Sequence, residues 1–333
     1  MAKGQRKSKV VTFGDYLTGA GDLPEEAFVG SLLWFTVTKR ARVTPSDVEQ
    51  RFIAHNLDSR YIPSLIAPAN AFRKATGPEA REHGYRLHDG HDAKALLRQL
   101  PSDRETMTRV VVRERIDATG KMLDHLEVGR IVFYKAARGA TAGSERVRFT
   151  LHDDRLQDGE RADLEQYLNK VNADYETYKN YLYDQPLRQM VREYVEGLNA
   201  VSVRPSGGLY FIHRSRWEEV RRLQALVQGL HDDCTMVLAP LPDLPEMREM
   251  LVEAFQDEIV DDVTRLVEEI EADRKAGKTV KAETIAKYSE TVRTIASRAE
   301  EHSRVLEVSQ DRTAGALENA YAVLAGLASQ IGE

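Results

Sequence analysis

Histidine and aspartate residues cluster in one polar stretch, and their side chains are of the kinds that ligate metal ions. The stretch "HGYRLHDGHD" contains His83, His88, Asp89, His91 and Asp92. Imidazole and carboxylate groups bind zinc and other divalent cations, so a metal-dependent nuclease is one hypothesis. The stretch lacks a helix that would fix the histidine spacing, however. We therefore interpret residues 77–94 as a polar linker or exposed loop and predict no metal site.

Other signatures of catalysis are weak or missing. The triplet "HDD" occurs at His152–Asp154 and again at His231–Asp233. A carboxylate pair at a strand end can hold magnesium, but turn-like sequence follows both triplets, which favours capping. The sequence has no serine elbow, no glycosidase carboxylate pair and no dinucleotide fingerprint. These observations favour a non-enzymatic protein that needs no cofactor.

Arginines gather around the corner "NAVSVRPSGGLYFIHRSRWEEVRRL", Asn199 to Leu223. Guanidinium groups neutralise phosphates and a tyrosine ring can stack on a base, so this surface is a candidate nucleic-acid interface. The alternative is a structural hairpin with ordinary mixed surface charge, since Glu193, Glu196, Glu218 and Glu219 lie among the arginines. The candidate residues are Arg188, Arg192, Arg204, Tyr210, Arg214, Arg216, Arg221 and Arg222.

The corner itself predicts a tight β-hairpin. Pro205 and Ser206 suit a type I turn, and Gly207 can adopt the left-handed conformation that closes a three-residue loop. This loop places Val201 opposite Phe211, so that apolar residues share one face. A phosphate-binding loop would need a longer glycine run followed by Lys-Ser or Lys-Thr, which "PSGGLYFI" lacks.

Periodicity and helix-start signals outline the elements before the corner. We expect helices over 23–39 and 44–57, the second capped by Thr44, and short helical pieces over 58–76. These pieces suit either a helix-turn-helix or a small orthogonal bundle. Alternating patterns in "RVVVRERID", "HLEVGRIVFYK" and "ERVRFTLH" predict three antiparallel strands. Amphipathic helices follow over 162–183 and 186–199.

Beyond the corner we expect a helix over 215–230 and a strand in "CTMVLAPL". The last part of the chain is alanine-rich and periodic. Apolar residues recur at three- and four-residue spacing, from Leu251 to Ile270 and again from Ile285 to Ile331, which predicts a coiled-coil seam. A short connection predicts two antiparallel helices, with a weak seam around Ser309 and Thr313. The first helix is acidic and should repel DNA.

Composition indicates a globular chain of two or three domains. It has 333 residues, 42% hydrophobic and 30% charged, with a formal net charge of −6. The first nine residues are basic, through Lys3, Arg6, Lys7 and Lys9. They suggest a solvated tail or a phosphate-seeking arm. Cys234 is the only cysteine, which excludes an intrachain disulfide and favours a reducing compartment. No secretion signal or membrane-spanning run is evident.

These expectations combine into an α+β fold. We predict a basic disordered tail over 1–20, a helical module over 21–78 and a central α+β domain over 105–245. The central domain should contain an antiparallel sheet and the hairpin, which would follow the helix over 186–199 as the wing of a winged helix does. A C-terminal antiparallel coiled-coil hairpin should occupy 246–333.

The phrase "VREYVEGLNAVSVRPSGGLYFIH" and the long helical C-terminus resemble uncharacterised proteins encoded by actinobacterial phages and mobile elements. The resemblance implies a role inside a bacterial host cell, with DNA metabolism, host takeover or defence evasion as themes, and it transfers no catalytic residue. Our leading hypothesis is a non-enzymatic binding protein that self-associates through its C-terminal helices and contacts DNA or RNA. The alternatives are a protein-interaction or assembly component acting on a host or phage protein, and the nuclease.

Overall fold

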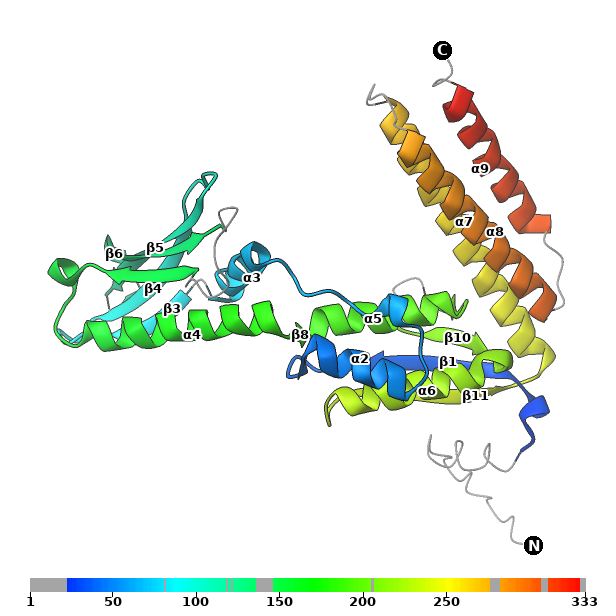
Figure 1. Ribbon diagram of the computed structural model, residues 1–333, viewed down its shortest axis with the longest axis horizontal. Helices are drawn as coiled ribbons and strands as arrows, with labels where there is room; N and C mark the ends of the chain where they lie inside the picture. Colours follow the sequence, from blue (N-terminus) through cyan, green and yellow to red (C-terminus); the bar gives the residue numbers. More distant parts are fainter. Residues whose placement is uncertain are drawn as a thin grey trace, which may run out of the picture. The chain divides into compact units, whose positions relative to one another are not determined.

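The computed structural model describes residues 23–80, 82–117, 119–120, 122–135, 146–204, 207–275, 282–306 and 311–329 (Figure 1). The chain divides into two compact units. The first, here called the sheet–bundle unit, consists of Met1–Lys39, Arg51–Tyr61 and Leu187–Glu333. The second, the meander unit, consists of Arg40–Gln50 and Ile62–Pro186. Both differ from the expected domains, because the meander unit is inserted into the sequence of the sheet–bundle unit.

The sheet of the sheet–bundle unit has the strand order β11-β1-β10-β9, with every neighbouring pair antiparallel. Leaving out the elements between Thr36 and Asp184, β1 (Phe28–Thr36) is followed by α5 (Asp184–Gly197), β9 (Val201–Ser202), β10 (Tyr210–His213), α6 (Trp217–Leu230) and β11 (Thr235–Pro242). These elements follow one another as βαββαβ. If the four strands are numbered by their order in the chain, their order across the sheet is 4-1-3-2. This is the topology of a ferredoxin-like split βαβ motif.

The helix expected over 23–39 is wrong, because most of this segment forms β1. The run "FVGSLLWFT" is apolar almost throughout, and such a run fits a buried strand as well as a buried helix. Its β-strand form pairs with β10 on one side and β11 on the other, so β1 lies inside the sheet. Only a three-residue 3-10 helix, Glu25–Ala27, precedes it among the described residues.

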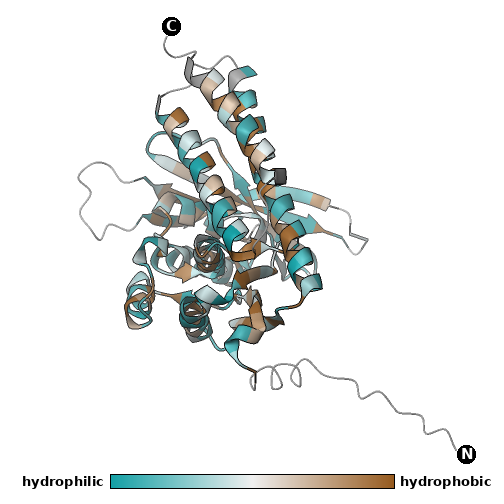
Figure 2. Cartoon of the chain, turned by 90° about the vertical axis from the view of Figure 1, so that its right-hand side faces the viewer, coloured by the Kyte–Doolittle hydropathy of each residue, from teal (hydrophilic) through white to brown (hydrophobic). Residues whose placement is uncertain are grey.

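Three helices form a C-terminal bundle: α7 (Pro245–Lys275), α8 (Ala282–Leu306) and α9 (Asp311–Ser329). Each contacts the other two, and Figure 2 shows hydrophilic and hydrophobic residues alternating along them. The expected two-helix hairpin is therefore wrong. The predicted second helix is divided between α8 and α9, and the interval 307–310, which contains Ser309, lies outside the described residues. Thr313, predicted to weaken the seam, is buried.

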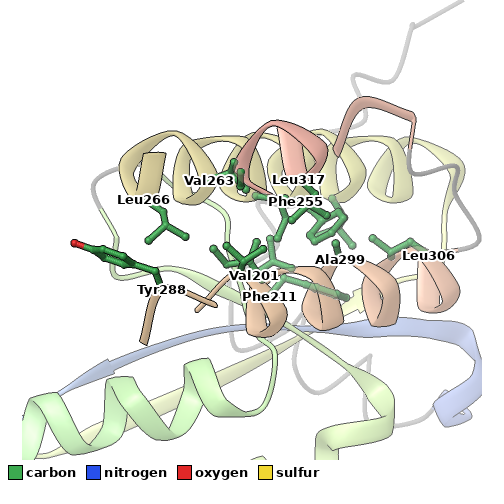
Figure 3. Packing of buried hydrophobic residues seen from close by; sticks show 14 of the residues in the cluster. Val201, Phe211, Phe255, Val263, Leu266, Tyr288, Ala299, Leu306 and Leu317 are labelled. Atoms are coloured by element: carbon green, nitrogen blue, oxygen red, sulfur yellow. The ribbon is translucent and has the colours of Figure 1, made fainter. Parts of the chain in front are cut away.

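The bundle packs against one face of the four-stranded sheet (Figure 3). Val201 and Phe211 project from β9 and β10 into the same apolar cluster as Phe255 of α7 and Ala299 of α8. Alternate strand residues, such as Leu33, are equally buried but point to the opposite face, as strand geometry requires. The C-terminal helices are thus part of the folded body rather than a separate rod.

Polar contacts fix the C-terminal end of α8 to the turn before β9. Glu301 accepts hydrogen bonds from the side-chain amide of Asn199 and, at 2.9 Å, from the guanidinium of Arg216. Next to it, His302 is only 4% exposed and its ring lies 4.6 Å from that of Phe255. Burial, reinforced by the positive charge of Arg298, lowers the pKa of His302 to about 4.

This histidine predicts a loss of stability in mild acid. The unfolded chain has a histidine pKa near 6.5, so between that value and about 4 the unfolded state binds more protons than the folded state. We expect the free energy of unfolding to fall by about 2 kcal/mol from about pH 7 to about pH 5. Urea denaturation should show this slope in the wild type and a flatter one in His302→Gln. Equal slopes in both proteins would contradict the assignment.

The meander unit contains a five-stranded antiparallel sheet of order β3-β4-β5-β6-β7. Its strands are β3 (Glu82–Arg86), β4 (Asp92–Gln99), β5 (Thr106–Ile116), β6 (Met122–Tyr134) and β7 (Val147–Leu151). Two helices, α3 (Pro68–Ala75) and α4 (Glu160–Asn180), contribute residues to one apolar cluster with it. The strand β2 (Arg42–Val43) pairs with β8 (Leu182–Tyr183). The helix α2 (Pro45–Ala54) is divided between the two units, and short 3-10 helices make up the remaining described elements.

Several sequence predictions for this region are confirmed and one is wrong. The three predicted strands correspond to β5, β6 and β7, and Thr44 caps α2 by accepting a hydrogen bond from the Asp47 amide at 3.1 Å. Residues 77–94, expected to be a linker, instead contain β3 and the start of β4. Polar residues alternate with half-buried His83 and Tyr85 there, which is an edge-strand pattern. The described residues of the helical module predicted over 21–78 are divided between the two units.

A buried polar network lies at the start of α4. Glu160, whose side chain is fully buried, pairs with Arg113 of β5 at 2.7 Å. It also accepts hydrogen bonds from the Tyr85 hydroxyl at 2.6 Å and from the backbone N–H of Gln157 at 2.9 Å. Burial, together with the bond to Glu160, raises the pKa of Tyr85. The network therefore joins the first turn of α4 to β3 and β5.

Candidate functional site

The β9–β10 hairpin has the predicted register. Phe211 lies opposite Val201, and the Val203 amide donates to the Leu209 carbonyl at 3.0 Å. Gly207 has a φ of 73°, in the left-handed region that the turn was expected to require. Pro205 and Ser206 lie outside the described residues.

The hairpin is not the free wing of a winged helix. A wing would extend beyond its domain, whereas β10 is hydrogen-bonded along its other edge to β1. The sequence could not show this, because the partner strand β1 is far away in the chain and was expected to be a helix. The hairpin instead forms one edge of the sheet, with β9 outermost.

Four of the predicted arginines, all beyond β10, bind groups of their own chain. Arg214 donates to the carbonyl oxygens of Glu26 and Phe28, Arg216 pairs with Glu301, Arg221 with Glu25, and Arg222 with Glu218. The closest of these contacts measure 2.9–3.0 Å. Carboxylates therefore offset three of the four charges, which reduces the positive charge that these arginines could offer to a phosphate.

The other four predicted residues are Arg188 and Arg192 of α5, Arg204 just after β9, and Tyr210 of β10. Arg188 donates to the Val37 carbonyl at 3.2 Å, and Arg192 hydrogen-bonds to the Tyr210 hydroxyl. Tyr210 is only 6% exposed, and burial raises its pKa. Its ring is therefore not open for base stacking, contrary to the prediction. Of these four, Arg192 and Arg204 are exposed and present a guanidinium group to solvent.

A groove of about 600 Å³, here called the acidic groove, lies beside β9. Its walls come from α5, the hairpin, α7 and one residue of α8, and five carboxylates outnumber three guanidinium groups. The charged lining residues are Arg192, Glu196, Asp257, Glu258, Asp261, Asp262, Arg265 and Arg298. The groove therefore carries an excess of negative charge.

Ion pairs and one backbone contact organise the inner wall of the groove. Arg298 bonds to Asp262 and lies 3.9 Å from Glu258. Glu258 also accepts a hydrogen bond at 2.9 Å from the amide of Ser202, a residue of the edge strand. Burial raises the pKa of Glu258, and the charge of Arg298 opposes this rise. Glu258 thereby occupies the backbone N–H of Ser202 on the outer edge of β9. Without this contact, that N–H group would be open to pairing with a strand of another chain.

The outer wall offers carboxylates to solvent. Asp257 and Asp261 are both exposed and are one turn apart on α7, so their side chains lie on the same face. Across the groove is Glu196 of α5. A cationic segment of a partner could contact all three, whereas a phosphate backbone would be repelled. The acidity of α7 was evident in the sequence, but its position beside the hairpin depends on long-range packing.

The histidines predicted as possible metal ligands make other contacts in the structure. His83 stacks on Tyr167 with ring centroids 5.0 Å apart, and Asp89 accepts a hydrogen bond from the His91 amide, as a turn-capping residue does. In the part of the chain that the structure describes, no three His, Cys, Asp or Glu side chains are grouped to hold a metal ion.

The fold and groove define a two-unit α+β protein with a groove lined largely by charged residues, and no described helix is long and apolar enough to cross a membrane. The chain belongs to a family of unknown function, DUF6744, whose model matches residues 28–333. Neither the curated proteins nor the solved structures contain a match to it.

Proposed function

We propose that this protein is a non-enzymatic binding protein whose acidic groove takes a basic segment of a partner protein. The observation that carries the proposal is the charge of the groove, where five carboxylates surround a space next to an edge strand. Two of these carboxylates, those of Asp257 and Asp261, are exposed to solvent. The proposal corresponds to a protein-interaction or assembly component.

Contact with DNA or RNA is the competing proposal. It is supported by exposed Arg192 and Arg204, and opposed by the carboxylates that flank both sides of the hairpin. Self-association through the C-terminal helices stays a prediction. The apolar residues that were expected to form its coiled-coil seam are buried within the bundle of a single chain. A phage or mobile-element context and a location inside a bacterial cell belong to the proposal too, and they rest on the sequence resemblance.

The groove predicts a specific charge dependence. In Asp257→Asn/Asp261→Asn, affinity for a lysine- and arginine-rich peptide should fall roughly tenfold, because each exposed charge contact contributes up to about 1 kcal/mol. Fluorescence anisotropy at low ionic strength measures this.

The matched control is Glu268→Gln/Glu300→Gln, which removes the same charge from exposed positions of α7 and α8 outside the groove. We expect it to bind as the wild type does, apart from a small long-range effect. Equal losses in both double variants would mean that net charge, rather than the groove, attracts the peptide.

A further inference from the structure

A cavity of about 240 Å³ lies in the meander unit, between the C-terminal end of α3, the start of β3 and one face of α4. All of its lining residues belong to that unit, so the cavity is separate from the acidic groove. It is smaller than the roughly 300–1,000 Å³ of sites for drug-sized molecules, which suits a smaller ligand. We propose that this cavity binds a free α-amino acid with an apolar side chain; the inference does not depend on the function proposed above.

Two lysines and two carboxylates line the cavity, and one of each is already engaged by the chain. Glu82 lies 3.7 Å from the amine of Lys94. The amine of Lys74 donates to the side-chain oxygen of Gln185 at 3.3 Å and lies 4.7 Å from the centre of the Tyr183 ring. The lining therefore leaves one cation and one anion for a ligand.

Lys170 and Asp174 are the two charges that remain. Neither side chain makes a hydrogen bond or an ion pair with another described residue. They are four residues apart on α4, so their Cβ atoms are about 5–6 Å apart on one surface of the helix. The carboxylate of an amino acid fits the Lys170 amine, and its ammonium group fits the Asp174 carboxylate. Charge-assisted bonds of this kind are stronger than neutral ones, and a ligand with a single charge would leave one of the two side chains unpaired.

The rest of the lining suits an apolar side chain. Ala75 and Val171 are buried, each 2% exposed. The rings of His83 and Tyr167 stack with their centroids 5.0 Å apart and their planes inclined by 5°. The Tyr167 hydroxyl donates to the Ala80 carbonyl, which fixes this wall. A flat aromatic surface beside buried apolar side chains favours an aliphatic or aromatic group over a charged one.

Titration with single amino acids tests the site in the full-length protein. Leucine and phenylalanine at millimolar concentrations should raise the Tm and give saturable heats in isothermal titration calorimetry. Glutamate and lysine should bind at least tenfold more weakly, because each brings a further charge into the cavity. If none of the four binds, or if glutamate and lysine bind as tightly as leucine, the inference is overturned and the function proposed for the acidic groove stands.

Two variants show whether each charge has its assigned role. N-acetyl-leucine lacks the ammonium charge and leucinamide lacks the carboxylate, so the wild type should bind leucine about tenfold more tightly than either derivative. Asp174→Asn should lose the preference over N-acetyl-leucine and keep the preference over leucinamide, and Lys170→Gln should do the reverse. The control is Glu165→Gln, which removes a charge from an exposed position of α4 outside the cavity and should keep both preferences. Preferences that persist unchanged in both variants would place the ligand elsewhere and overturn the inference.

Discussion

Replacing Phe211 by alanine is expected to destabilise the sheet–bundle unit by about 3–5 kcal/mol, the range for truncating a fully buried aromatic side chain. Phe211 is 0% exposed and lies in the apolar cluster that joins β10 to the bundle. The truncation leaves a cavity between two layers, and neither layer can close it without moving a whole element. Because a domain is stable by only about 5–15 kcal/mol, this loss should be large enough to unfold part of the population near physiological temperature.

Urea denaturation followed by circular dichroism measures the effect. The control is Tyr321→Ala, which truncates an aromatic side chain of α9 that is 47% exposed, and should change stability by less than about 0.5 kcal/mol. A loss below about 1 kcal/mol for Phe211→Ala would show that the bundle does not pack on this face of the sheet.

The second large effect is expected in the meander unit, from Arg113→Met. This change leaves the buried Glu160 carboxylate without its cation, which costs about 3–5 kcal/mol in comparable buried pairs. The hydrogen bonds from Tyr85 and Gln157 remain, but they do not supply a compensating charge.

A double variant distinguishes this explanation from loss of packing. Arg113→Met/Glu160→Gln removes both charges. The oxygen of the new side-chain amide can accept the bond from the Gln157 backbone N–H while its NH2 group donates to the Tyr85 hydroxyl oxygen, so most of the lost stability should return. If the double variant is as unstable as Arg113→Met, the packing of the arginine side chain rather than the uncompensated charge explains the effect. Thermal unfolding of both variants provides the comparison.

Local signals in the sequence predicted local structure well. The turn residues around Gly207 determined the register of Val201 and Phe211, because a three-residue loop fixes which positions face each other. The amphipathic stripe of α5 was equally clear: Leu187, Met190 and Val191 are all buried as their spacing required. Both inferences depend only on neighbouring residues.

Contacts between distant residues could not be predicted in the same way. The run Phe28–Thr36 is apolar on both faces, so its periodicity does not separate a strand from a helix, and only pairing with β10 and β11 makes it a strand. Contacts between distant residues also decided which predicted residues of the candidate site are available. Arg216 was expected to bind phosphates, but its partner Glu301 lies 85 residues away and became apparent only when α8 packed near it.

The central claim is that the acidic groove prefers a basic protein segment to a nucleic acid. The most direct measurement is fluorescence anisotropy of a labelled lysine- and arginine-rich peptide and of a labelled oligonucleotide of similar length, each titrated with full-length wild type at low ionic strength. We predict saturable, salt-sensitive binding of the peptide and none of the oligonucleotide. Binding of the oligonucleotide without binding of the peptide would contradict the account.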